Sequence, residues 1–255
     1  MKNYYFVAAS LPSLALDQEL EISFASLMEL FAMNLGREDL EQITLLRSYF
    51  DIENLFHLLR DETLNLKGNL FRGELEEAIL HPETLPNFLQ EFFIRYPKEE
   101  QQLKNSHIAY ELYFHFAQEE AKGFLKRYLQ FERKRRLSLA AYRAKKQGRD
   151  WAQELIDEER FDSFTASLLA QKEGKGIEFS FDLRDLGEKL LSVSKPYEEA
   201  HMMAEYRLNK IDDLSEFPLF SFDYLVAYTI KLIILEEMAN YDQELGREKW
   251  NVVSG

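Results

Sequence analysis

The chain has no cysteine among its 255 residues, so a disulfide framework, a thiolate metal site and a cysteine nucleophile are all excluded. Proline is scarce too, with six residues in total and none between Pro97 and Pro196. Because proline interrupts helices, this interval can hold long helices. The sequence also lacks a Gly-x4-Gly-Lys-Ser/Thr loop, a Gly-x-Ser-x-Gly elbow and a dinucleotide-binding fingerprint. Their absence excludes a P-loop nucleotide hydrolase and favours a scaffold over an enzyme.

Long hydrophobic runs are also missing. The most apolar stretch, Phe217 to Leu235, is interrupted by Asp223 and Lys231 and falls short of the roughly 20 clean residues that a membrane helix needs. We therefore expect a central core helix there. The apolar start, Tyr4 to Leu16, has no clear cleavage site, so a core segment is preferred to a signal peptide. Together with the lack of cysteine, this fits a protein of the reducing cytoplasm.

Basic residues are fewer than acidic ones: the chain has 31 Lys and Arg and 45 Asp and Glu, so its formal net charge is −14. Such a surface repels nucleic acid and anionic lipid, so we expect no nucleic-acid partner. The positive charge is concentrated, however: residues 126–149 contain ten Lys or Arg and one Glu, a net +9 that leaves −23 for the rest. This asymmetry indicates either an electrostatic partner surface or an internal charge match.

Four consecutive cations lie inside that basic segment: Arg133, Lys134, Arg135 and Arg136. On a helix they point all round the axis, so some of them must face the protein or a partner. One interpretation is a solvated face balanced by the acidic remainder of the chain, and the other is contact with an acidic surface of another protein. We expect this run to lie on or near a partner surface. No recognition motif for nucleic acid accompanies it.

Hydrophobic periodicity predicts an all-α fold, because no βαβ rhythm is present. Loops are expected at residues 81–86, 96–98, 172–182 and 215–221, and the alternating segment 176–182 is the one candidate for a short strand. Asp39 is the expected N-cap of the second helix. The expected helices cover residues 13–34, 39–63, 70–80, 84–95, 99–119, 121–147, 149–171, 182–194, 196–212 and 221–243.

The segment from Arg47 to Arg60 reads Arg-Ser-Tyr-Phe-Asp-Ile-Glu-Asn-Leu-Phe-His-Leu-Leu-Arg, which places Asp51 and Asn54 inside a wide apolar helical arc. Carboxylates are seldom buried unpaired, so Asp51 needs a partner. Arg47, one helical turn back, is the expected partner, and Asn54 is expected to hold a neighbouring helix. No convincing base or nucleophile accompanies Asp51, so we expect it to be structural and not catalytic.

Fainter echoes of this segment follow later in the chain. Each unit contains a tyrosine-led helix and reaches a glycine stop: Tyr49 to Gly68, Tyr128 to Gly148 and Tyr224 to Gly246. The second and third units share Gly-Arg-acid before Trp151 and Trp250. A threefold repeat would divide one helical unit, residues 1–255, into lobes at about 1–98, 99–175 and 176–255. Helical heptads alone can also produce such similarity.

The first unit resembles the C/d family of the V/A-type rotary ATPases, whose helices carry Asp-Ile-x-Asn-Leu-x-x-Leu-Leu-Arg, as Asp51 to Arg60 does. In the second unit Lys134 and Leu137 stand where that family has an acid and an asparagine. The opening Tyr-Tyr-x-x-Ala-Ser-Leu-Pro pattern is more similar to an uncharacterised bacterial group thought to be related to this family. The residues that match the family in the second unit are Tyr128, Glu132, Arg143 and Gly148. The structural residues implied by the first two units are Arg47, Asp51, Asn54, Arg60, Glu132 and Arg143.

The resemblance implies an all-α funnel of three similar lobes about a pseudo-threefold axis. It implies a protein without catalytic activity or cofactor that connects the central stalk to the membrane rotor ring of a proton- or sodium-transporting V-type ATPase or ATP synthase; we call this component the connector. The expected partners are other V-type ATPase subunits. The expected location is the cytoplasm, at the inner face of the membrane, which the protein reaches only through the rotor ring.

Two alternatives are a helical adaptor unrelated to ATPases and a metal-dependent helical enzyme. His107, Glu111 and His115 share one helix face at spacings of four residues. Glu198 and His201 form a single Glu-x-x-His pair, whereas a di-iron bundle needs two such pairs and two further glutamates. We therefore expect no metal site.

Overall fold

The computed structural model describes residues 4–150, 162–171 and 177–254, and within these ranges all regular secondary structure is helical. The expected all-α fold is confirmed. The chain divides into two compact units, one formed by Met1–Leu40 with Asp185–Gly255 and the other by Glu41–Arg184. This division does not test the expected three lobes, which stay a prediction.

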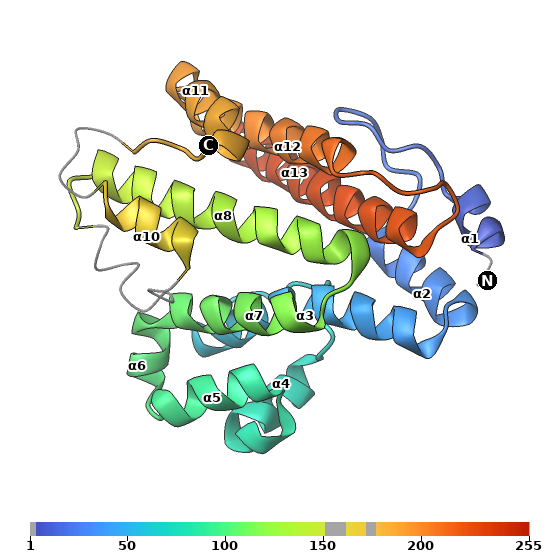
Figure 1. Cartoon of the computed structure of the whole chain (residues 1–255), viewed down its shortest axis with the longest axis horizontal. Coiled ribbons are helices and arrows are strands. Elements are labelled where there is room, and N and C mark those ends of the chain that lie inside the picture. Colours follow the sequence, from blue (N-terminus) through green and yellow to red (C-terminus); the bar gives the residue numbers. More distant parts are fainter. Residues whose placement is uncertain (1–3, 151–161, 172–176, 255) are drawn as a thin grey trace. The chain divides into compact units, whose positions relative to one another are not determined.

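The first unit is built on the pairing of two long helices, α12 (Pro196–Asp213) and α13 (Phe222–Ser254), which run side by side in Figure 1. Helix α13 also packs against α2 (Phe24–Asn34), and α2 packs against α1 (Tyr5–Ser10). A shorter helix, α11 (Arg184–Ser192), precedes α12. The α13 face from Leu225 to Leu235 is almost wholly buried, which confirms the expected core helix.

The second unit contains most of α3 (Arg37–Leu59), the similarly long α8 (Gly123–Lys146) and several shorter helices. Helix α7 (Ser106–Glu120) contacts α5 (Asn87–Arg95) on one side and α8 on another, as Figure 1 shows. The remaining helices of this unit are α4 (Arg72–Leu80), the 3₁₀ helix η1 (Pro82–Thr84), α6 (Glu99–Lys104), α10 (Ser163–Leu169) and the 3₁₀ turn η2 (Phe181–Leu183). Among the described residues Tyr113 is the largest fully buried side chain, and its hydroxyl donates to the Leu45 carbonyl at 3.1 Å.

The expected helix over residues 13–34 is wrong in its first half. Asp17 has a φ of 63°, which a right-handed helix cannot contain. Helix α2 begins only at Phe24, after Ser23, whose hydroxyl accepts a hydrogen bond from the Ser26 amide at 3.1 Å. Asp39 is not an N-cap either, since α3 begins at Arg37 and the Asp39 carboxylate accepts from the Tyr4 hydroxyl at 3.0 Å.

Other expected boundaries also differ. The expected helix 99–119 is broken at Asn105, between α6 and α7. Of the candidate strand, Gly176 lies outside the described residues, 177–180 have no regular structure and η2 follows. Trp151 and residues 151–161 of the expected helix 149–171 also lie outside the described residues.

The three expected glycine stops behave differently. Gly148 ends α8 with a φ of 69°, a conformation that favours glycine. Gly68 lies in a loop nine residues beyond α3, and Gly246 lies within α13 and does not end it.

None of the described helices combines the length and the hydropathy needed to span a lipid bilayer.

Candidate functional site

The residues that the sequence singles out on α3 hold a loop, residues 65–70, which we call the clasp loop. Asp51 is buried, and its Oδ1 accepts hydrogen bonds from the backbone amides of Asn69 at 2.6 Å and Leu70 at 3.0 Å. Its Oδ2 accepts from the side-chain amide of Asn69 at 2.6 Å. Three donors thus satisfy a carboxylate that burial would otherwise make very unfavourable.

Asn54 binds the other end of the clasp loop. Its Oδ1 accepts from the Asn65 amide at 2.6 Å, and its Nδ2 donates to the Asn65 carbonyl at 2.8 Å. Arg47 adds a third attachment, because its Nε donates to the Lys67 carbonyl at 3.0 Å and its guanidinium also donates to the Gly68 carbonyl. Side chains on one face of α3 therefore pair with the backbone N–H and C=O groups of the clasp loop. In a sheet or helix these groups would pair with other backbone groups.

Burial raises the pKa of Asp51, although the hydrogen bonds from Leu70 and Asn69 and the charge of Arg47 oppose the shift. Burial disfavours the charged form of Arg47 as well, and it therefore lowers the pKa of that side chain. The expected pairing of these two residues is therefore only part of the arrangement, since both side chains use hydrogen bonds to reach the clasp loop. The expectation that Asn54 holds a neighbouring helix is wrong, because it holds Asn65.

The clasp loop leads directly into α4 and leaves apolar side chains in solvent. Leu66 is 91% exposed and Phe71, the residue before α4, is 79% exposed. The Phe71 amide donates to the Glu74 carboxylate at 2.8 Å, which fixes the start of α4. Arg60, the last residue of the motif, lies outside the clasp and has an ion pair with Glu62 at 3.9 Å.

The basic run on α8 engages groups within its own unit. Arg133 is buried and forms an ion pair with Asp162, the N-cap of α10, while Lys134 forms a 2.7 Å ion pair with Asp182. The pKa of Asp162 lies below its usual value, because hydrogen bonds from the Phe164 amide and Arg133 outweigh the effect of burial. The pKa of Asp182 is also lowered, chiefly by Lys134.

The other two cations are held similarly. Arg135 pairs with the buried Glu132, one turn back on α8, with 3.0 Å between Nε and Oε2. Arg136 donates to the Tyr49 hydroxyl, and its guanidinium lies 4.4 Å from the centre of the Tyr110 ring. The structure therefore shows an internal charge match. The partner-surface interpretation of residues 133–136 stays a prediction. Arg143 is exposed on α8.

The residues considered for a metal do not form a cluster. Within the described ranges, no group of three His, Asp or Glu side chains lies close enough to hold a metal ion. His115 lies 4.0 Å from Glu111. His201 pairs with Asp17 at 3.2 Å, whereas Glu198 pairs with Lys195 at 2.8 Å.

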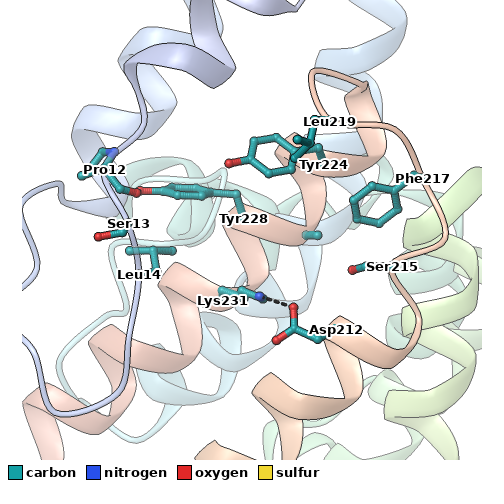
Figure 2. Close-up of a pocket in the computed structure, with 11 residues that line it drawn as sticks. Pro12, Ser13, Leu14, Asp212, Ser215, Phe217, Leu219, Tyr224, Tyr228 and Lys231 are labelled. Atoms are coloured by element: carbon teal, nitrogen blue, oxygen red, sulfur yellow. Dashed lines mark hydrogen bonds and ion pairs between the residues drawn. The ribbon is translucent and has the colours of Figure 1, made fainter.

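The first unit contains a pocket that the sequence does not predict. It has a volume of about 310 Å³ and is lined by α12, α13, the loop between them and the extended segment after α1 (Figure 2). Its polar edge is the ion pair between Lys231 and Asp212. Its wall carries three aromatic rings and several smaller side chains, namely Pro12, Ser13, Leu14, Ser215, Phe217, Leu219, Tyr224, Ala227 and Tyr228.

One wall of this pocket is fixed by Tyr228, whose hydroxyl donates to the Pro12 carbonyl at 2.9 Å. Burial, together with the nearby Tyr224 and Glu21, raises the pKa of Tyr228 to about 12, so this hydroxyl stays a neutral donor. The signal in the sequence was Lys231, a cation inside the most apolar stretch of the chain. A lysine at such a position needs an acid nearby, here Asp212 from another helix.

Residues 1–253 match the family described as "Protein of unknown function (DUF2764)". An uncharacterized protein of Chlamydia muridarum is 20% identical over 260 residues, which cover 99% of this chain and 98% of the relative. Uncharacterized proteins of Chlamydia trachomatis serovar D and Chlamydia pneumoniae are each 22% identical, covering 84% and 97% of this chain and 84% and 96% of the relatives. No solved structure matches.

None of these descriptions names a rotary ATPase, so the resemblance to the connector rests on the motif of α3. The family match covers nearly the whole length, and both compact units are included in it. The chain belongs to the DUF2764 family.

Proposed function

We propose that this protein is a non-catalytic component of a V-type rotary ATPase, in the position of the connector between the central stalk and the membrane rotor ring. The observation that carries the proposal is the clasp on α3. Asp51 and Asn54, two of the polar residues of the connector-like motif, both use their hydrogen bonds to hold the clasp loop. The motif therefore stabilises the fold, and such a role is consistent with a motif shared by non-catalytic scaffold proteins.

The clasp also supports a role in binding other proteins. A contact residue on a rigid backbone loses less conformational entropy on binding than one on a mobile loop. Leu66 lies within the clasp loop, between the residues that Asn54 and Asp51 hold, and Phe71 follows the loop directly. Both are large, exposed and apolar, which is typical of anchor residues at protein interfaces.

The charge of the chain favours partners with a basic surface. The net charge is −14, and the cations of the 133–136 run already engage acids or aromatic rings within their own unit. The acidic excess is therefore available for long-range attraction to a partner of opposite charge. In the proposed assembly the partners are subunits of the stalk and the ring, and the membrane is approached only through the ring.

Affinity purification from the native cell tests the proposal. We expect the tagged chain to retrieve V-type ATPase subunits, and the double variant Leu66→Glu/Phe71→Glu to lose them. Leu191→Glu is the matched control, because Leu191 is 79% exposed in the other unit. All three side chains are exposed, so thermal unfolding should change little in any of these variants.

The proposal is wrong if the wild-type chain retrieves no ATPase subunit under conditions in which a tagged stalk protein retrieves the complex. Retrieval of a different set of proteins, lost in the double variant, would instead identify a helical adaptor unrelated to ATPases. A second cheap test is the position of the gene, which the proposal expects among the genes for V-type ATPase subunits.

A further inference from the structure

The pocket of the first unit combines an apolar wall with one fixed cation. Phe217, Tyr224 and Tyr228 line it with ring faces, and Lys231 reaches its edge from α13 (Figure 2). Its volume of about 310 Å³ lies at the lower end of the range for small-molecule sites. The space therefore suits a group about the size of one aromatic ring with a short chain.

The two side chains of the ion pair differ in their exposure to solvent. The Lys231 side chain is 25% exposed, whereas the Asp212 side chain is 63% exposed at the end of α12. An ion pair with so exposed a member contributes little to stability, about 0–1 kcal/mol. Asp212 can therefore turn into solvent at small cost, whereas the ammonium of Lys231 would remain at the pocket and need another anion.

A second polar group, the Tyr224 hydroxyl, also lines the pocket. The Tyr224 hydroxyl points toward the space beside the Tyr228 ring in Figure 2, whereas the Tyr228 hydroxyl is already engaged by the Pro12 carbonyl. A phenol can donate to a carboxylate oxygen. The pocket thus offers an ammonium at its edge, a phenol hydroxyl on its wall and aromatic rings around the remaining space.

We propose that this pocket binds an apolar carboxylate. The apolar body fills the space among Phe217, Tyr224 and Tyr228, and the carboxylate replaces Asp212 as the partner of Lys231. A cationic ligand is disfavoured, because Lys231 already occupies the position next to Asp212. An uncharged apolar ligand would leave the ion pair closed. The proposal goes beyond the proposed function and does not depend on it.

The same chemistry has two sources, a free aromatic acid or the C-terminal carboxylate of a protein whose last residue is apolar. Chemical-shift titration of the full chain with 4-phenylbutyrate, with a short peptide ending in Phe and with the same peptide amidated at its C-terminus distinguishes them. We expect saturable binding of the acid, the free-carboxylate peptide or both, and none of the amide. Binding of the acid alone identifies a small-molecule site, and preference for the peptide identifies a chain terminus.

Three variants test the geometry. Lys231→Gln should weaken binding at least tenfold, whereas Asp212→Asn should strengthen it, by up to about fivefold, because the competing carboxylate is gone. Lys195→Gln is the control, since it removes an exposed lysine of the same unit that pairs with Glu198 away from the pocket. A purely structural ion pair would not give opposite effects in its two members.

The proposal is overturned if neither carboxylate ligand binds at millimolar concentration, or if the amide binds as tightly as the acid. It is also overturned if Asp212→Asn weakens binding as much as Lys231→Gln does. Thermal unfolding of each variant checks the fold. If Lys231→Gln does not fold, the predicted gain in Asp212→Asn still decides the question.

Discussion

A Cβ atom built on Gly68 would lie 2.7 Å from Nδ2 of Asn54 and 2.8 Å from Oδ1 of Asp51. The clasp loop therefore approaches α3 so closely that only glycine fits between the two side chains that hold it. These side chains are fixed by their own hydrogen bonds to Asn65, Asn69 and Leu70, so they cannot move aside without losing them.

Gly68→Ala should therefore destabilise the protein by about 1–3 kcal/mol, the usual penalty for overpacking a site whose neighbours cannot shift. Urea denaturation of wild type and variant measures this difference. Gly73→Ala is a matched control, because no atom lies within 4 Å of a Cβ built there and Gly73 is helical in α4. It should be stabilising by about 0.5–1 kcal/mol. Equal effects of the two substitutions would contradict the close approach.

The stability of the clasp should depend on pH through Asp51. Because burial raises its folded-state pKa above the unfolded value, its protonation stabilises the folded protein fully below a pH of about 3.8. That contribution is lost as the pH rises through the folded-state pKa. We expect the stability difference between wild type and Asp51→Asn to shift in favour of wild type as the pH falls toward 4. A shift in the opposite direction would show that the folded-state pKa is lowered.

Two neighbouring cations on α8, Arg133 and Lys134, should differ in how much they contribute to the free energy of unfolding. Arg133→Met is expected to cost about 1–3 kcal/mol, because a buried guanidinium and its hydrogen bonds to Asp162 and Thr165 are lost. Lys134→Met should cost no more than about 1 kcal/mol, because its pair with Asp182 is half exposed. Guanidinium denaturation at moderate ionic strength compares them. A larger effect for Lys134 than for Arg133 would contradict the greater burial of the Arg133 ion pair.

Arg136 joins α8 to aromatic rings of α3 and α7, since its guanidinium lies 5.2 Å from the centre of the Tyr49 ring and 4.4 Å from that of Tyr110. Arg136→Gln should cost about 1–2 kcal/mol. It should also change the near-ultraviolet circular dichroism of the tyrosines. An exposed control on the same helix, Lys126→Gln, should change neither property. An unchanged spectrum for Arg136→Gln would show that the stacked arrangement is absent.

Much of the helical frame follows from the sequence. Long helices with continuous apolar periodicity, such as α8 and α12, were predicted with boundaries within two residues. The failure at residues 13–23 has a local cause, because Asp17 takes a left-handed conformation that periodicity cannot reveal. Gly246 did not end α13, since an isolated glycine costs a helix only about 1 kcal/mol.

The site was predictable in part. The expected burial of Asp51 predicted that it needs a partner, but its partners are two backbone amides and the side-chain amide of Asn69, which no pattern of charged residues discloses. A usable signal existed in the loop sequence, where Asn65, Gly68 and Asn69 are residues that favour turns. Lys231 signalled in the sequence that an acid lies nearby, but the pocket could not be located, because Asp212 and Lys231 meet only through the packing of α12 on α13.

The most direct measurement of the central claim starts from the ATPase. A V-type ATPase purified from the native cell through a tagged stalk protein should contain this chain in about one copy per complex, measured by quantitative mass spectrometry. It should contain no separate connector, and replacing the chain by Leu66→Glu/Phe71→Glu should remove it from the complex. A complete and active complex that contains another connector and none of this chain would contradict the account.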